Sequence, residues 1–157
     1  MTSSPPAARL EPAFVRLAVV LLTGVLAVVF DTTIVNVALD TLGRDLHAGI
    51  ATVQWVTTGY LLALAIVVPV TGWLLDLLGA KTLWISALAL FLVGSVGASL
   101  SWNAGSLIAF RVVQGAGGGI MLTVMTTLLM QSLGGRSIGS ATAVIAMPVL
   151  LGPILGP

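Results

Sequence analysis

Residues 53–75, VQWVTTGYLLALAIVVPVTGWLL, decide the fold, because 23 consecutive residues here carry no acidic or basic side chain. The run lies inside a longer block of 30 residues, between Asp45 and Asp76, that contains no Asp, Glu, Lys or Arg. A helix needs about 20 predominantly apolar residues to cross a bilayer. This stretch therefore predicts a transmembrane helix.

The composition of the whole chain favours lipid over water as its environment. Of the 157 residues, 58% are hydrophobic and 7% are charged, and the mean hydropathy is +1.16. A soluble domain carries about a quarter of its residues as charges, so this chain could not cover a soluble globule. The net charge of +1 comes without a basic cluster, which argues against a nucleic-acid partner. The absence of cysteine excludes disulfides and thiolate metal sites, and we expect no cofactor.

Other charge-free blocks of similar length flank the first one. The interval from Lys81 to Arg111 encloses 29 residues, that from Arg111 to Arg136 encloses 24, and 21 residues follow Arg136. An earlier apolar block is interrupted by Asp31. The sequence thus predicts an all-α transmembrane bundle with four complete spans and most of a fifth. After a tail of residues 1–16, the expected spans are 17–38, 53–75, 82–100, 107–130 and 138–157.

The distribution of basic residues predicts a cytoplasmic N-terminus. In that orientation four basic residues lie inside and one outside, which is the positive-inside bias; they are Arg9, Arg16, Lys81 and Arg136 inside, and Arg44 outside. A secretory signal peptide is the alternative for the first span, but no A-x-A-like site closes that run. We expect a multi-pass protein of the plasma or inner membrane.

Two charged residues, Asp31 and Arg111, fall inside predicted spans. At 1.5 Å per residue, Asp31 lies about 21 Å from the inner surface and Arg111 about 24 Å from it, so the two share a level in the outer half of the membrane. Arg111 shares its helix face with Gln114 and Gly115, and Gly115 forms a GxxxG pair with Gly119 that permits close helix approach.

An ionisable residue inside a membrane costs roughly 2.5–3.5 kcal/mol on insertion scales, so it is by default a functional candidate. The alternatives are a structural ion pair or two side chains that extend to the interface. Burial favours the neutral form of a carboxyl group, whereas a nearby arginine favours the charged form. A carboxylate between these influences, such as Asp31, can take up or release a proton when helices rearrange.

Four stretches of the sequence resemble signatures of the major facilitator superfamily, in particular its fourteen-span drug:proton antiporter branch. Residues 31–39, DTTIVNVAL, resemble the first-helix signature of that branch, although Asp40 stands where proline is usual. Residues 54–61 resemble the start of its second helix, and residues 111–117, RVVQGAG, its fourth-helix signature. The fourth stretch is the loop signature at residues 72–81, GWLLDLLGAK.

The loop resemblance implies a gating role for Gly72, Asp76, Gly79 and Lys81. In the family, the aspartate interacts with a helix end of the opposite half and steadies the outward-open state. This sequence has Leu77 and Ala80 where the family usually has arginine, which weakens the expected charge network. Without the resemblance, the favoured interpretation of Asp76 and Lys81 is a pair of solvated loop charges, which contribute little to stability.

The last residues, 152–157 or GPILGP, resemble the beginning of the antiporter signature of the fifth helix. Gly152, Gly156 and Pro157 match it, whereas the family's following glycine pair would lie past residue 157. Small residues four apart permit tight helix contact, and proline removes one helical hydrogen bond. We expect this chain to be an N-terminal portion of a longer transporter.

The resemblance implies proton-coupled efflux of small drug-like or toxic compounds, with Asp31 carrying the proton and Arg111 tuning it. The implied partners are the lipid bilayer, protons, a small-molecule substrate and the missing C-terminal transporter half. No Ser-His-Asp set or carboxylate pair indicates an enzyme, and His47 has no second ligand for a metal nearby. The alternatives are a nonfunctional fragment, a non-transporting membrane assembly or regulatory protein, and a self-associating small transporter.

Overall fold

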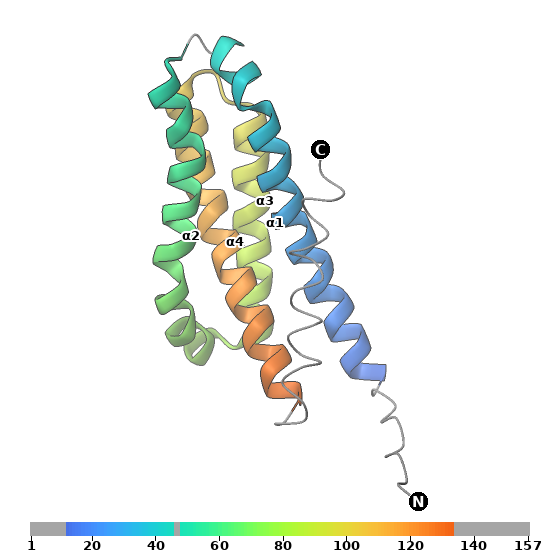
Figure 1. Cartoon of the computed structure of the whole chain (residues 1–157). Coiled ribbons are helices and arrows are strands. Elements are labelled where there is room, and N and C mark those ends of the chain that lie inside the picture. The colour runs from blue at the N-terminus through green and yellow to red at the C-terminus, as the bar shows by residue number, and fades with distance from the viewer. Residues whose placement is uncertain (1–11, 46–47, 134–157) are drawn as a thin grey trace, which may run out of the picture.

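The computed structural model describes residues 12–45 and 48–133, which form four long helices arranged side by side (Figure 1). The helices are α1 (Pro12–Asp45), α2 (Ile50–Leu78), α3 (Ala80–Ser99) and α4 (Ala104–Leu133). All four are long and apolar enough to cross a membrane. The predicted all-α bundle and its first four spans are thus confirmed, and the predicted fifth span, 138–157, lies outside the described residues.

The helices are longer than most of the predicted spans, and α1 shows the largest difference. Residues 12–16, which we assigned to the tail, form its first turn, and residues 40–45, which we assigned to a polar connection, form its last turns. The span prediction ended near charged residues because lipid excludes them. A helix satisfies its own backbone hydrogen bonds in either environment, so α1 continues past the charges.

A single residue, Gly79, connects α2 to α3. Its φ of 74° and ψ of 156° lie in a region that residues with a Cβ rarely adopt. Its N–H donates to the carbonyl of Leu75, and its own carbonyl accepts from Leu83, at 3.0 and 3.1 Å. The chain therefore reverses direction through one residue, without an intervening loop.

Replacing Gly79 by alanine is expected to destabilise the bundle by about 1–3 kcal/mol, because the added Cβ is strained at this positive φ. The thermal unfolding midpoint of the purified protein in detergent, followed by circular dichroism, measures the effect. Gly49→Ala is the matched control, since Gly49 has a φ of −65° and open space around it. An equal loss of stability in both variants would contradict this explanation.

Helix α4 is the centre of the bundle, and it packs extensively against both α2 and α3. Figure 1 shows that α1 is tilted relative to the other helices, with its first turn at the same end of the bundle as the Gly79 turn. At the other end of the bundle, Asn103 caps α4: its side-chain oxygen accepts from the Ser106 N–H at 2.8 Å, and its own N–H donates to the Ser106 hydroxyl.

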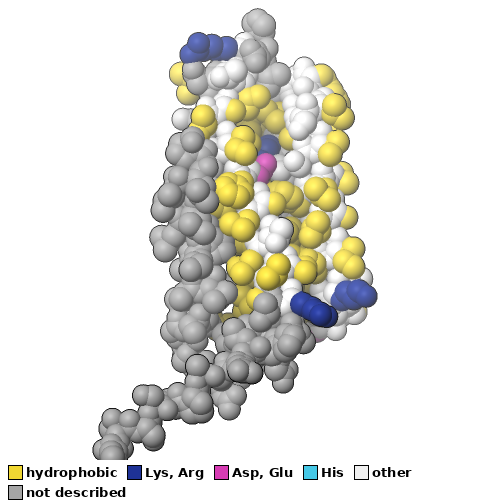
Figure 2. Space-filling model, turned by 90° about the vertical axis from the view of Figure 1, so that its right-hand side faces the viewer, with side chains coloured by type: hydrophobic (Ala, Val, Ile, Leu, Met, Phe, Trp, Pro, Cys, Tyr) yellow, Lys and Arg dark blue, Asp and Glu magenta, His cyan; other side chains and the backbone are white. Residues whose placement is uncertain are grey.

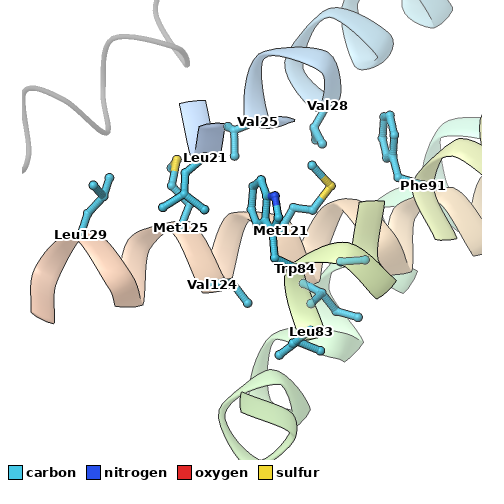
Figure 3. Packing of buried hydrophobic residues seen from close by; sticks show 12 residues of the cluster. Leu21, Val25, Val28, Leu83, Trp84, Phe91, Met121, Val124, Met125 and Leu129 are labelled. Carbon is cyan, nitrogen blue, oxygen red and sulfur yellow. The ribbon is translucent and has the colours of Figure 1, made fainter. Parts of the chain in front are cut away.

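The hydrophobic core lies between α1, α3 and α4 in the half of the bundle nearer the Gly79 turn. Figure 3 shows its side chains from the three helices pointing toward one another; they include Leu21, Val25, Val28, Trp84, Phe91, Met121 and Met125. Gly24 makes room for this cluster, since a Cβ there would lie 2.7 Å from both Met121 and Trp84 side-chain atoms. The core thus fills one half of the bundle, and the polar site described next lies beyond it.

Candidate functional site

Asp31 from α1 and two residues of α4 form a closed network of hydrogen bonds. Arg111 Nη1 donates to Asp31 Oδ2 at 2.5 Å and to Gln114 Oε1 at 2.8 Å. Gln114 Nε2 donates to Asp31 Oδ1 at 2.8 Å. Arg111 and Gln114 are three residues apart, which places them on one face of α4. Each oxygen of the carboxylate therefore accepts one hydrogen bond, and the Gln114 amide joins the acid to the base.

The network is buried unevenly. The Arg111 and Gln114 side chains are 2% and 0% exposed, whereas the Asp31 side chain is 19% exposed. In Figure 2, an acidic side chain and a basic one lie next to each other in a face that is otherwise largely hydrophobic. The arginine is therefore enclosed by protein, and the carboxylate is the member of the network that can be reached from outside.

This arrangement makes the ion pair responsive to protonation. Arginine keeps its charge at all accessible pH values, so Asp31 is the member of the pair that can change its charge. A proton on Asp31 removes the charge attraction to Arg111 and leaves Arg111 with uncharged hydrogen-bond acceptors in this network. Breaking a buried pair is costly. Protonation of Asp31 therefore changes how strongly α1 is held to α4.

Tyr60 of α2 completes the surroundings of Arg111, and our sequence interpretation missed it. The guanidinium carbon lies over the Tyr60 ring, 4.3 Å from its centroid, in cation–π geometry. The sequence does not show which face of α2 meets α4, so it did not single out Tyr60. The one available signal is that an aromatic residue lies within the second-helix stretch that resembles the family.

Glycines on α4 bring α2 close enough for this contact. A Cβ on Gly115 would overlap the backbone carbonyl of Tyr60, and one on Gly119 would lie 2.6 Å from the carbonyl oxygen of Leu64. The predicted GxxxG pair therefore faces α2. On the opposite side of α4, Gly94 of α3 packs against the backbone of Gln114 in the same way. The network thus lies where three helix backbones approach closely.

Gly115→Ala is expected to destabilise the protein by about 1–3 kcal/mol, because the new methyl group meets backbone rather than a movable side chain. The change also moves Tyr60 relative to Arg111. Gly72→Ala is the matched control, since Gly72 is helical and a Cβ there meets nothing within 4 Å. Thermal unfolding in detergent tests both, and similar midpoints for the two variants would contradict close packing at Gly115.

The predicted gating residues lie at the far end of α2 and do not meet the network. Gly72, Asp76 and Gly79 are exposed, and so is Lys81 at the start of α3. Their gating role stays a prediction. The three predicted antiporter residues of the fifth span, Gly152, Gly156 and Pro157, lie outside the described residues.

The fold and the site together define a class of protein. Four span-length helices with exposed apolar side chains form an integral membrane protein, and this one holds a buried ion pair between two of its helices.

Comparison with known proteins identifies the family. The family model of the Major Facilitator Superfamily matches residues 21–157, so this chain belongs to that superfamily. It is 41% identical over 150 residues to the multidrug resistance protein B homolog of Mycobacterium tuberculosis strain H37Rv, covering 95% of this chain and 28% of that protein. It is 35% identical over 127 residues to the putative multidrug resistance protein MdtD of Salmonella typhi, covering 81% of this chain and 27% of that protein.

These matches confirm the resemblance to the superfamily. The chain is similar to transporters named for multidrug resistance, in a superfamily that is generally not enzymatic. It spans about a quarter of the length of these two relatives. What the whole protein transports, and how, is therefore a matter of proposal.

Proposed function

We propose that this chain supplies the proton-coupling helices of a transporter that exports small drug-like or toxic compounds across the cell membrane in exchange for protons. The observation that carries the proposal is the Asp31–Arg111–Gln114 network, an ion pair within the membrane-spanning part of the bundle. An intramembrane ionisable residue is by default a functional one. The names of the relatives support the substrate class.

The coupling of proton uptake to helix movement depends on Asp31, because its carboxyl group is the one group of the ion pair that can change its charge. With Asp31 ionised, the carboxylate holds α1 to α4 through Arg111 and Gln114. When Asp31 takes up a proton, its hold on the guanidinium weakens, and α1 is free to move against α4. Transporters of this kind alternate by the rocking of helical halves around a site near mid-membrane. A proton on Asp31 thus biases one of the two arrangements.

The proposal assigns secondary roles to the remaining predicted residues. Gly72, Asp76, Gly79 and Lys81 form the gating loop on the cytoplasmic side, and Gly152, Gly156 and Pro157 shape the packing that limits leak. The partners are the lipid bilayer, protons, a small-molecule substrate and the remaining transporter half. The positive-inside rule places the N-terminus in the cytoplasm, so Asp31 lies in the outer half of the membrane.

The experiment uses the protein expressed from its complete gene and reconstituted into vesicles. A cationic dye is supplied outside, and a pH gradient is imposed with the vesicle interior acidic. We expect dye accumulation that collapses when a protonophore removes the gradient. Accumulation that persists without any gradient would contradict proton coupling, and a complete lack of dye or drug movement across a panel of such compounds would contradict drug export.

A further inference from the structure

Tyr60 occupies the junction of α1, α2 and α4 without a role in the mechanism so far. Its side chain is fully buried, and its ring lies against the Arg111 guanidinium. The hydroxyl lies next to Gly118 and Val28, since a Cβ on Gly118 would be 3.1 Å from the hydroxyl and 3.3 Å from a methyl group of Val28. Tyr60 therefore touches the residue on which the ion pair depends, and it does so from a helix that contributes nothing else to the network.

The hydrogen bonds alone hold the guanidinium from one side. Both bonds to the network, to Asp31 and to Gln114, come from Nη1. Within residues 12–45 and 48–133, Arg111 Nε is buried without a hydrogen-bond partner. Hydrogen bonds from Nη1 fix the position of that nitrogen but do not by themselves fix the plane of the guanidinium. The Tyr60 ring lies against this plane, and a desolvated cation–π contact favours the orientation of the guanidinium over the ring.

We propose that Tyr60 is a positioning residue, whose ring keeps Arg111 aimed at Asp31 and thereby sets how readily Asp31 takes up a proton. The proposal rests on the proposed function and adds α2 to the coupling machinery. It assigns the effect to the ring. The hydroxyl is excluded from the role, because it is buried and has no hydrogen-bond partner within the described residues.

The ring also explains how the pair can form again after it opens. When Asp31 is protonated, Arg111 retains its charge in a buried place and needs stabilisation there. Gln114 provides one acceptor, and the Tyr60 ring provides a second favourable contact. Together, Gln114 and the Tyr60 ring keep the guanidinium in the same position while Asp31 is protonated. Without the ring, the guanidinium is no longer kept in that position, and the ionised state of Asp31 loses part of its stabilisation.

Few other charged groups of the described residues lie close to Asp31. Arg111 of α4 faces it directly, and Tyr60 of α2 lies behind Arg111. Among the described residues of α3, the one charged side chain is Lys81 in its first turn, at the opposite end of the bundle. On α1 itself, the charged positions are Arg16, 15 residues before Asp31, and Asp40, Arg44 and Asp45, 9, 13 and 14 residues after it, so the nearest is about 14 Å away along the helix. A change at Tyr60 therefore reaches Asp31 through Arg111.

Two substitutions separate the ring from the hydroxyl. Tyr60→Phe keeps the ring and removes the hydroxyl, whereas Tyr60→Leu removes both. Val56→Ala is the matched control, since Val56 is buried one turn away on α2 and its truncation removes apolar packing alone. Infrared spectroscopy of the reconstituted protein follows the Asp31 carboxyl band as the pH is changed, and Asp31→Asn identifies that band by its loss.

We expect the Leu variant to protonate Asp31 at a pH about one unit higher than the wild type, roughly a tenfold change. The Phe and Val56→Ala variants are expected to titrate like the wild type. Equal titration of the Leu and wild-type proteins would overturn the proposal. So would a shift in the Phe variant as large as that in the Leu variant. Tyr60→Met, which fills the ring's space flexibly, replaces Leu if the latter does not fold, and the Phe result alone can still overturn the proposal.

Dye export separates this inference from the proposed function. The pH profile of export by the Leu variant should shift in the same direction as the pH at which its Asp31 carboxyl band titrates. The Phe variant should have the wild-type profile. Wild-type export with the same profile in all variants would overturn the positioning role alone. Absence of wild-type export would overturn the proposed function, while the infrared titration would still decide whether Tyr60 positions Arg111.

Discussion

Asp31→Asn is expected to reduce gradient-driven dye export to the background of vesicles without protein. Asparagine has nearly the shape of aspartate but cannot take up or release a proton in this pH range. Its side-chain oxygen can still accept the hydrogen bond from Arg111 Nη1, and Gln114 and Tyr60 still contact the guanidinium. The variant should therefore fold and insert into the membrane, but it can no longer exchange a proton for substrate.

The control for this variant is Asp31→Glu, which keeps the carboxyl group and adds one methylene. It should retain export that depends on the gradient, at a reduced rate, because the longer side chain displaces the guanidinium. Circular dichroism and the thermal midpoint in detergent establish that each variant is folded. If Asp31→Asn exported dye with intact dependence on the pH gradient, Asp31 would not be the coupling group.

The sequence was sufficient to predict the membrane fold because charges are costly in lipid. Each of the four described helices contains a block that is free of charge or interrupted by one charged residue. A single glycine, Gly79, connects α2 to α3. The helix ends were harder to place. The continuation of α1 to Asp45 involves polar residues that are compatible with a helix in water, so composition gave no boundary there.

The site could be predicted in part. Rise per residue was enough to place Asp31 and Arg111 at one depth, and the structure places them in contact. The roles of these residues in proton coupling stay predictions. Depth does not give helix rotation, so the sequence did not show that Gln114 bridges the pair, or that Tyr60 lies beneath Arg111. The first fact depends on how α1 is rotated against α4, and the second depends on which face of α2 packs against the α4 glycines.

Arg111→Met is expected to lower the free energy of unfolding by about 3–5 kcal/mol at neutral pH, since it leaves Asp31 ionised without its partner. The loss should shrink as the pH falls, because a protonated Asp31 no longer needs a counter-charge. Unfolding of the purified protein in mixed micelles, titrated with denaturing detergent at several pH values, measures both effects. A loss that is the same at every pH would mean that methionine disturbs packing, and that the missing charge is irrelevant.

The double variant Asp31→Asn/Arg111→Met decides why the chain keeps an ion pair here. Replacing a buried pair by well-packed hydrophobic residues of similar volume is often neutral or stabilising, and the polar asparagine stands at the partly exposed position of the pair. We therefore expect the double variant to be within about 1–2 kcal/mol of the wild type, and more stable than Arg111→Met alone. It should be inactive in dye export. Such a result would mean that the fold does not need the pair, and that the pair exists for coupling. A double variant less stable than Arg111→Met would instead assign the network a structural role.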